Sequence, residues 1–128
     1  MTTVKFYRCK HCGNIIIKIE DHKVPVMCCG EEMEELIPNT VDAATEKHVP
    51  VVSIHDYEVT VTVGEVAHPM EEAHMIGWVY IVTNQGAQRK FLKANTDPVI
   101  EFALCPDEKL QEVYAYCNLH GLWMTKAQ

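Results

Sequence analysis

Cysteine and histidine are the residues of this chain whose spacing predicts chemistry, with six Cys and seven His among 128 residues. Cys9 and Cys12 form a C-x-x-C pair, and Cys28 and Cys29 form a second, adjacent pair. A C-x-x-C turn lets two thiolates reach one ion from the same loop, and a second pair completes a tetrahedron. A glycine follows each pair, where the backbone needs freedom to turn. The sequence therefore predicts a four-thiolate metal site.

The metal of this site is not fixed by the spacing. Cys28 and Cys29 are joined by a short tether, so we expect a geometry distorted from ideal tetrahedral angles. Zinc and iron both accept four thiolates, and the simplest role for either is a structural staple. A disulfide pair is the third alternative.

A second group of metal-binding residue types is spread over the rest of the chain: His48, His68, His74, Cys117 and His120. Cys117 and His120 are three residues apart, close enough in a turn to bind one ion. Taken singly, each of these His is more often a surface or hydrogen-bonded residue, and a lone Cys is usually a small buried apolar side chain. Taken together, four imidazoles and one thiolate favour a redox iron, because zinc prefers four-coordinate sites.

The elements that must position these residues are predicted to be short strands. Tyr57, Val59, Val61 and Val63 alternate with polar residues, which is typical of a half-buried strand. A continuous apolar run at 78–82 ends at a turn signal, and further short strands are expected at 91–92, 99–104 and 113–117. No segment has helical periodicity over three turns. The pattern predicts a mainly β fold, an antiparallel sandwich or barrel.

The first part of the chain is expected to be a separate module. Residues 1–37 hold little apolar material, so a metal staple is needed to stabilise them. We expect a strand at 15–19 and one helical turn at 31–36. Residues 38–44 resemble a linker with several turn residues. The predicted domains are therefore 1–37 and 38–128.

Composition narrows the classes of protein. The chain has 18 acidic and 11 basic side chains and a formal net charge of −7, which argues against binding to nucleic acid. No apolar run approaches the roughly 20 residues of a membrane span. The opening residues lack the apolar core of a secretory signal, so we expect a cytoplasmic protein. In that compartment metal or redox chemistry is a better use of six Cys than disulfides.

Four motifs carry a resemblance to the desulfoferrodoxin family, the two-iron superoxide reductases. The Cys9-x-x-Cys12 and Cys28-Cys29 pairs resemble the desulforedoxin-type module of that family. Its catalytic-domain motifs are similar to three further segments: Glu46-Lys47-His48-Val49-Pro50, His68-Pro69-Met70-Glu71-Glu72-x-His74 and Cys117-Asn118-Leu119-His120-Gly121-x-Trp123. The resemblance covers nearly the whole chain, and the motifs occur in the same order as in the family.

The resemblance implies two iron ions per chain. Cys9, Cys12, Cys28 and Cys29 would hold a distorted tetrahedral iron, with zinc as an alternative. The second iron would have an axial thiolate and an open position opposite, with these ligands: His48, His68, His74, His120 and Cys117. The larger domain of the family is an immunoglobulin-like β-sandwich, and its members are typically homodimers with rubredoxin as the usual electron donor.

The activity implied is one-electron reduction of superoxide, with two protons, to hydrogen peroxide, without release of O2. Glu46 would close the ferric site as a sixth ligand, and Lys47 would attract the anion and help supply protons. A mobile loop would place both over the open position. A local cation is needed because the net charge of −7 would otherwise repel superoxide.

Two rival functions remain at this point. The first is a non-catalytic iron electron-transfer protein, which needs no open position on its metal. The second is a zinc-stapled β-sandwich that binds a protein partner. Cys105 belongs to none of the motifs, and we expect it to be a buried apolar residue at a strand end.

Overall fold

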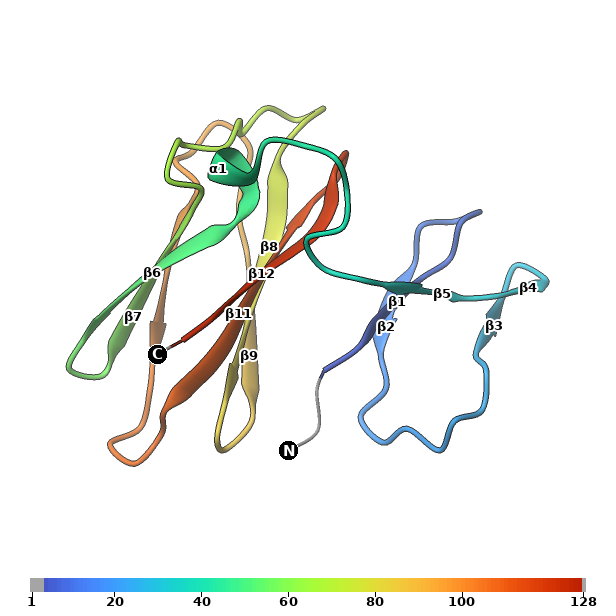
Figure 1. The fold of residues 1–128 in the computed structure, drawn as a ribbon, viewed down its shortest axis with the longest axis horizontal. Helices are drawn as coiled ribbons and strands as arrows, with labels where there is room; N and C mark the ends of the chain where they lie inside the picture. The colour runs from blue at the N-terminus through green and yellow to red at the C-terminus, as the bar shows by residue number, and fades with distance from the viewer. Residues whose placement is uncertain (1–3, 128) are drawn as a thin grey trace. The chain divides into compact units, whose positions relative to one another are not determined.

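The computed structural model describes residues 4–127, so the first three residues and the last residue of the predicted domains lie outside the described part. The chain divides into two compact units, Met1–Ile37 and Pro38–Gln128, and each is built of antiparallel strands (Figure 1). The prediction of a mainly β chain is confirmed. Among the described residues the single helix is α1 (Thr45–His48). It is too short and too polar to span a membrane.

The first unit has a three-stranded sheet in the order β2-β1-β5 and a separate two-stranded hairpin. The strands are β1 (Phe6–Arg8), β2 (Ile15–Ile17), β3 (Met27–Cys28), β4 (Glu31–Glu32) and β5 (Glu34–Leu36). Of its described hydrophobic residues, only Phe6, Cys9 and Met33 are buried. So small an apolar core stabilises a fold weakly, which agrees with the expectation of a metal staple.

The helical turn predicted at 31–36 is wrong. This segment forms β4 and β5, and β5 pairs with β1 so that Leu36 lies opposite Phe6 and Glu34 opposite Arg8. The pairing covers an edge of β1, and Met33, which directly precedes β5, is buried. These tertiary contacts override the modest helix preference of the glutamates.

The second unit is a sandwich of two antiparallel sheets, so of the two predicted alternatives the sandwich is confirmed. One sheet has the order β10-β7-β6, and its strands are β6 (Pro50–His55), β7 (Glu58–Val63) and β10 (Val99–Ala103). The other has the order β12-β11-β8-β9, and its strands are β8 (Ile76–Thr83), β9 (Ala87–Phe91), β11 (Leu110–Cys117) and β12 (Gly121–Lys126).

The core lies between the two sheets. Val59, Val61 and Val63 of β7 are fully buried, as the alternating pattern predicted, and they pack with Val79 and Ile81 of β8. Tyr57, the first residue of that pattern, lies in the turn before β7 and is exposed. Burial of each such side chain contributes roughly 1.5–3 kcal/mol. Cys117 belongs to the same cluster, so the end of β11 is anchored directly in the core.

One end of the sandwich carries every residue predicted to bind the second metal. Cys117 pairs with Ile76 on one side and with Gly121 on the other, and Pro50 pairs with Val63. The segments 64–75 and 118–120 and helix α1 therefore all lie at this end of the two sheets, which Figure 1 shows at the top of the sandwich. Antiparallel strands bring these distant parts of the sequence together.

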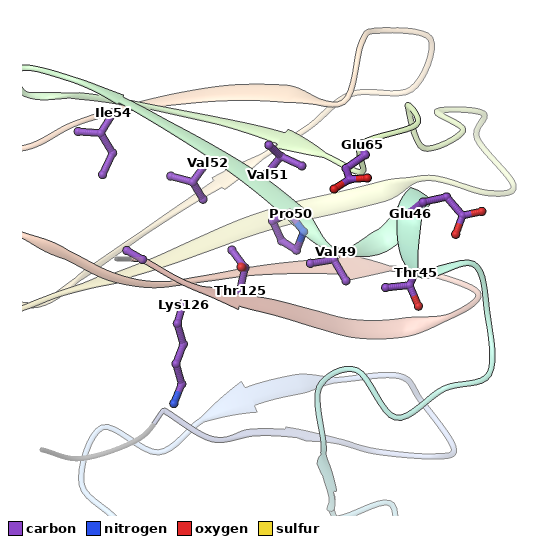
Figure 2. Close-up of a pocket in the computed structure, with 11 residues that line it drawn as sticks. Thr45, Glu46, Val49, Pro50, Val51, Val52, Ile54, Glu65, Thr125 and Lys126 are labelled. Carbon is purple, nitrogen blue, oxygen red and sulfur yellow. The ribbon is translucent and has the colours of Figure 1, made fainter.

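Helix α1 takes the place of the expected mobile loop around Glu46 and Lys47. The Val66 N–H donates to the Glu46 carbonyl oxygen at 2.9 Å, and the Gly64 N–H donates to the Val49 carbonyl oxygen at 3.2 Å. The backbone of the helical turn is therefore held against residues 64–66. The Glu46 side chain lines the β6 groove, an open hollow of about 720 Å³ whose lining includes Glu65, Pro50, Val51, Val52, Ile54 and Lys126 (Figure 2).

Gly64 permits the close approach of α1. Its φ is +89°, and a Cβ there would meet the Val66 carbonyl oxygen and lie 2.7 Å from the Lys47 carbonyl carbon and oxygen. A side chain at this position would therefore be strained in its own backbone and would push α1 away.

We predict that Gly64→Ala lowers the free energy of unfolding by about 2–4 kcal/mol, because positive φ and backbone overlap both oppose the methyl group. Chemical denaturation followed by circular dichroism measures the loss. Gly77→Ala is the matched control, because a Cβ at Gly77 meets nothing within 4 Å. Equal losses in the two variants would contradict the assignment.

Candidate metal centres

The four N-terminal cysteines lie in two tight turns. Cys9 and Cys12 lie in the turn between β1 and β2, where the Gly13 N–H donates to the Cys9 carbonyl oxygen at 3.0 Å. The second pair lies at the β3–β4 hairpin, where Cys29 has φ +52° and Gly30 has φ +78°. Two consecutive positive φ values are typical of a type I′ hairpin turn. The glycine that follows each pair thus supplies the backbone freedom expected from the sequence, since Gly13 also has φ +82°.

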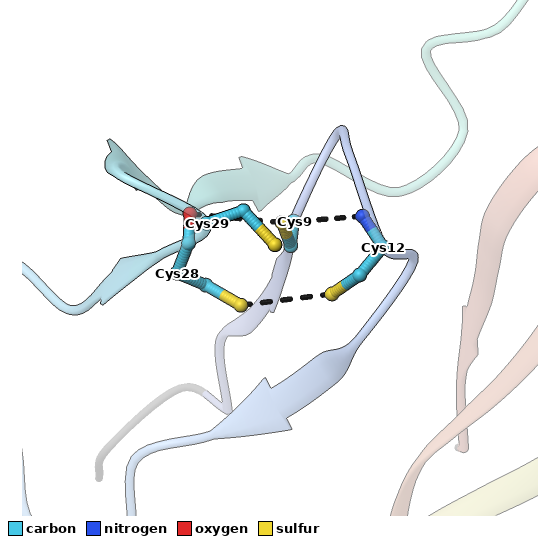
Figure 3. Close-up of side chains that lie close together, drawn as sticks. All are labelled: Cys9, Cys12, Cys28 and Cys29. Atoms are coloured by element: carbon cyan, nitrogen blue, oxygen red, sulfur yellow. Dashed lines mark hydrogen bonds between the residues drawn. The ribbon is translucent and has the colours of Figure 1, made fainter.

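The two turns bring the four sulfurs together (Figure 3). All four Sγ atoms lie within 4.8 Å of one another, and the Cys12 and Cys28 sulfurs are 3.6 Å apart. Sulfurs bound at 2.3 Å to one tetrahedral ion are about 3.8 Å apart. The arrangement fits a single four-thiolate ion.

Hydrogen bonds favour thiolates at part of this cluster. The Cys12 N–H lies 3.5 Å from the Cys9 sulfur and lowers the pKa of the Cys9 thiol to about 6. The pKa of Cys29 is instead raised to about 12, first through its hydrogen bonds with the Cys9 and Cys12 side chains. The thiols share protons in this arrangement, so full ionisation of the cluster requires a cation that displaces them.

The second centre is a closed ring of four imidazoles. Neighbouring ring centroids are separated by 4.6 Å for His48 and His68, 4.8 Å for His68 and His74, 5.1 Å for His74 and His120, and 4.9 Å for His120 and His48. Neighbouring planes are inclined by 74° to 89°. The rings therefore follow one another around a common centre.

Backbone carbonyls fix which nitrogen of two rings faces this centre. The His48 Nδ1 lies 2.7 Å from the Ala44 carbonyl oxygen, and the His68 Nδ1 lies 2.7 Å from the Pro69 carbonyl oxygen. A carbonyl oxygen only accepts, so both Nδ1 atoms carry the ring hydrogen. In a neutral imidazole the Nε2 atom then has a bare lone pair.

The two bare Nε2 atoms of His48 and His68 face each other at 3.1 Å. Burial lowers the pKa of both rings, that of His68 to about 4, so both are neutral at pH 7. Two lone pairs at this distance repel each other unless a cation lies between them. Nitrogens on adjacent corners of a metal square, each 2.1 Å from the ion, are about 3.0 Å apart.

The remaining donors point to the same centre. The His120 Nδ1 lies 3.1 Å from the His48 Nε2 and 3.9 Å from the Cys117 sulfur. The Nε2 of His74 is buried, and within residues 4–127 it has no hydrogen-bond partner. One group of donor atoms lies within 4.8 Å of one another, those of His48, His74, Cys117 and His120. His68 joins this group through its contacts with His48 and His74. An unpartnered buried imidazole nitrogen fits a metal ligand.

Asn118 and Trp123, both in the motif at residues 117–123, hold the candidate ligands in position. The sequence did not reveal this role. The Asn118 side chain accepts from the Met75 N–H and donates to the Ala73 carbonyl oxygen, both at 3.0 Å. It thereby fastens the segment of His74 to the loop of Cys117 and His120. The buried Trp123 stacks on the His48 ring at 4.8 Å, and its Nε1 donates to the His120 carbonyl oxygen at 3.1 Å.

Glu46 and Lys47 are both exposed on α1. Within residues 4–127 neither side chain makes a hydrogen bond or ion pair, so both are free to act on a ligand. The charge of Lys47 reaches the ring of imidazoles, since it contributes to the lowered pKa of His48 after burial and the neighbouring His. The Glu46 side chain lines the β6 groove.

The expectation for Cys105 is wrong, because this residue is exposed. It lies in the turn before Pro106, where its carbonyl oxygen accepts from the Glu108 N–H. The remaining histidines lie outside both centres: His11 and His22 are close to Glu31 and Glu20, and His55 is exposed at the end of β6.

Comparison with known proteins places these centres in a family. The desulfoferrodoxin family model matches residues 40–126. Desulfoferrodoxin of Nitratidesulfovibrio vulgaris is 42% identical over 123 residues, covering 96% of each chain. This chain belongs to the desulfoferrodoxin family. A desulfoferrodoxin homolog of Archaeoglobus fulgidus is 40% identical over 98% of this chain and 99% of its own. The superoxide reductase from Treponema pallidum has a similar structure, with a TM-score of 0.83 and 39% identity over 98% of this chain and 100% of that one.

We predict that Asn118→Ala weakens metal binding at the ring of imidazoles by about 10- to 100-fold, as is typical when a group that orients ligands is lost. Chelator competition measures this, with the four-Cys site as an internal reference. Asn118→Asp keeps the acceptor for the Met75 N–H and should lose less affinity.

The matched control for this prediction is Asn84→Ala. Asn84 joins two loops in the same manner at the other end of the sandwich, accepting from the Lys109 N–H at 2.8 Å and donating to the Asp107 carbonyl oxygen at 3.4 Å. An equal loss of metal affinity in both variants would show a general loss of stability instead.

A separate prediction concerns the first unit, whose apolar core is small. We expect Cys28→Ser to remove its metal and to unfold β1–β5, while the strands of the second unit keep their protection. Amide hydrogen exchange of the two units checks this. Cys105→Ser is the control, because Cys105 is exposed and lies outside both clusters. Protection of β1–β5 that survives in Cys28→Ser would contradict the stapling role.

Proposed function

We propose that this chain is a superoxide reductase that acts at an iron held by the ring of imidazoles and Cys117. The carrying observation is the pair of bare Nε2 atoms of His48 and His68, which needs a cation at the centre of the ring. The similarity to the Treponema pallidum superoxide reductase over 98% of this chain supports the same activity. A superoxide reductase of Pyrococcus horikoshii is also 34% identical over 65% of this chain.

The residues proposed to hold the iron are those that meet at this end of the sandwich: His48, His68, His74, His120 and Cys117. Iron bound there would supply the single electron that converts superoxide to the peroxide level. Five protein donors would leave room for a small anion, because iron accepts up to six ligands. A pure electron carrier needs no such position, which argues against the rival function.

The surroundings of Cys117 suit a thiolate ligand. Its side chain is fully buried in the core, and its sulfur accepts the His120 N–H at 3.4 Å. Burial protects the thiolate from oxidants in solution, and the hydrogen bond limits its charge. A thiolate ligand would raise the electron density at the iron, which would favour electron transfer to superoxide.

Lys47 and Glu46 are the proposed catalytic residues. Lys47 attracts superoxide toward the centre against the net charge of −7, and its ammonium group donates protons through water to the departing peroxide. The Glu46 carboxylate would be a further ligand to the iron when no substrate is bound. Its side chain lines the β6 groove, so this role requires rotation about its side-chain bonds.

A second iron, with zinc as the alternative, is proposed to be held by the four N-terminal cysteines: Cys9, Cys12, Cys28 and Cys29. Residues 1–37 would then be a desulforedoxin-like module and residues 38–128 the catalytic domain, which is supported by the two compact units. The module is proposed to act mainly as a staple. We propose further that the protein is a cytoplasmic homodimer that takes electrons from a rubredoxin.

The proposal is tested by metal analysis and visible spectroscopy, followed by addition of superoxide to the reduced protein. We expect iron, a coloured thiolate-bound centre, and hydrogen peroxide without O2. Zinc in both centres and no peroxide would contradict the enzyme, whereas zinc in the four-Cys site alone would not affect the activity.

We predict that Lys47→Ile lowers the second-order rate constant with superoxide by about tenfold at low salt, because the attraction between the ammonium group and the anion is lost. The dependence of the rate on ionic strength should also flatten. Pulse radiolysis measures both. Lys109→Ile, which removes the same charge at the other end of the sandwich, is the control. Unchanged rates in Lys47→Ile would remove this residue from the mechanism.

A further inference from the structure

The linker at residues 38–44 is fastened to strand β12 by Asn39. The Asn39 N–H donates to the Leu122 carbonyl oxygen at 3.0 Å. Its side-chain Nδ2 donates to the Met124 carbonyl oxygen at 3.1 Å, and its Oδ1 accepts from the Met124 N–H at 2.9 Å. These three bonds, the Asn39 clasp, occupy backbone groups on the outer side of β12, which is an edge strand of its sheet.

Asparagine suits this position for two reasons. The backbone of Asn39 has φ +62°, and asparagine tolerates this left-handed region better than most residues with a side chain. Its amide also carries an acceptor and a donor side by side, so it can bond both the N–H and the carbonyl oxygen of one residue. Glycine would keep the backbone conformation and lose the two side-chain bonds, which makes it the informative substitution.

The clasp binds on either side of a residue that supports the second metal centre. Leu122 and Met124, the two residues that accept or donate in the clasp, flank Trp123 in β12. The indole ring of Trp123 stacks on the His48 ring at 4.8 Å. Three consecutive residues of β12 therefore support the ring of His48 and hold the linker that leads to it.

The linker runs from the clasp to the carbonyl group that holds His48. Val41 passes the start of β12, with its Cγ2 3.5 Å from the place that a Cβ on Gly121 would take. Ala44 then precedes α1, and its carbonyl oxygen accepts from the His48 Nδ1 at 2.7 Å and from the Lys47 N–H at 3.2 Å. The position of this carbonyl decides which nitrogen of His48 carries the ring hydrogen.

Helix α1 does not hold this carbonyl by itself. The helix has four residues, and so short a helix is unstable alone because its first turn is costly to form. Ala44 is its N-cap and makes no side-chain bond to it. The bonds from residues 64 and 66 are accepted by Val49 and Glu46, which both follow Ala44 in the chain. The position of the Ala44 carbonyl therefore depends on the linker before it, where the clasp lies.

We propose that Asn39 is a positioning residue for the ring of imidazoles. Its clasp holds the linker on β12, and the linker holds the Ala44 carbonyl. This carbonyl keeps the His48 Nε2 bare and directed at the centre. The proposal rests on the metal centre of the proposed function but not on superoxide as the substrate. Its tests therefore measure metal binding and hydrogen exchange, and their outcome is independent of turnover.

The first test is Asn39→Gly, which keeps the backbone bond to Leu122 and removes the two side-chain bonds. We expect the affinity of the ring for ferrous iron to fall by about tenfold, because a group that orients a ligand is released. Anaerobic competition with a ferrous chelator measures this on the full-length chain, with the four-Cys site as the internal reference.

Asn95→Gly is the matched control for this variant. Asn95 is also exposed and has φ +65°, but its side chain makes no hydrogen bond within residues 4–127. The same change of residue type in the same backbone conformation should therefore leave the affinity unchanged. An unaltered affinity in Asn39→Gly, or an equal loss in Asn95→Gly, would overturn the proposal.

Exchange of the ring hydrogens separates positioning from a general loss of stability. In Asn39→Gly the Nδ1 proton of His48 should exchange with solvent at least about tenfold faster, because the carbonyl that holds it moves more freely. The Nδ1 proton of His68, held by the Pro69 carbonyl, should be unchanged and is the internal control. Proton NMR of the ferrous protein measures both, and 15N labels serve when a diamagnetic ion occupies the ring. Equal acceleration at the two rings, or none, would contradict the assigned role.

Amide exchange tests the clasp itself in solution. The Met124 N–H is bonded to the Asn39 Oδ1, so it should exchange at least about tenfold faster in Asn39→Gly than in the wild-type chain. The Trp123 amide points to β11, since successive N–H groups of a strand point to opposite sides, and it should change little. Fast exchange of Met124 in the wild-type chain would show that the clasp does not form, and the proposal would fail with it.

Discussion

Two imidazole nitrogens that face each other without a hydrogen between them set the main constraint on this fold. The Nε2 atoms of His48 and His68 are 3.1 Å apart, and the carbonyl oxygens of Ala44 and Pro69 hold the ring hydrogens on the other side. Such a contact is stable only around a cation, so the backbone that fixes these tautomers is part of the metal site. The scaffold must hold this unfavourable arrangement before an ion binds.

The sandwich meets that requirement by fixing the candidate ligands to rigid elements. Cys117 ends a core strand, Asn118 fastens the segment of His74, and Trp123 supports the His48 ring. Gly64 allows α1 to approach closely enough to bring His48 to the others. Because each of these segments is bonded to a neighbour, the free energy of the packed sheets is used to keep the donors in place.

The residues that meet at the two centres were predictable from the sequence because Cys and His occur in motifs with little alternative use. The buried strand β7 was predictable because its apolar residues alternate. Residues 31–36 formed strands and not a helical turn, since pairing with β1 decides their structure and local propensity does not. Strands β6 and β12 were not predicted, because their buried and exposed positions do not alternate. The role of Asn118 depends on a loop 43 residues away in sequence, which no local pattern encodes.

The two centres differ in how their cysteines are buried and in the size of the apolar core around them. In the first unit the thiolates replace a core: Cys12 and Cys29 are exposed, and few apolar side chains are buried around them. In the second unit the core holds the site, and Cys117 is fully buried. An exposed cluster is directly accessible to other redox proteins, but water and oxidants reach it equally. The buried Cys117 sulfur is screened from both. The same atom type is therefore suited to stability in one unit and, as proposed, to reactivity in the other.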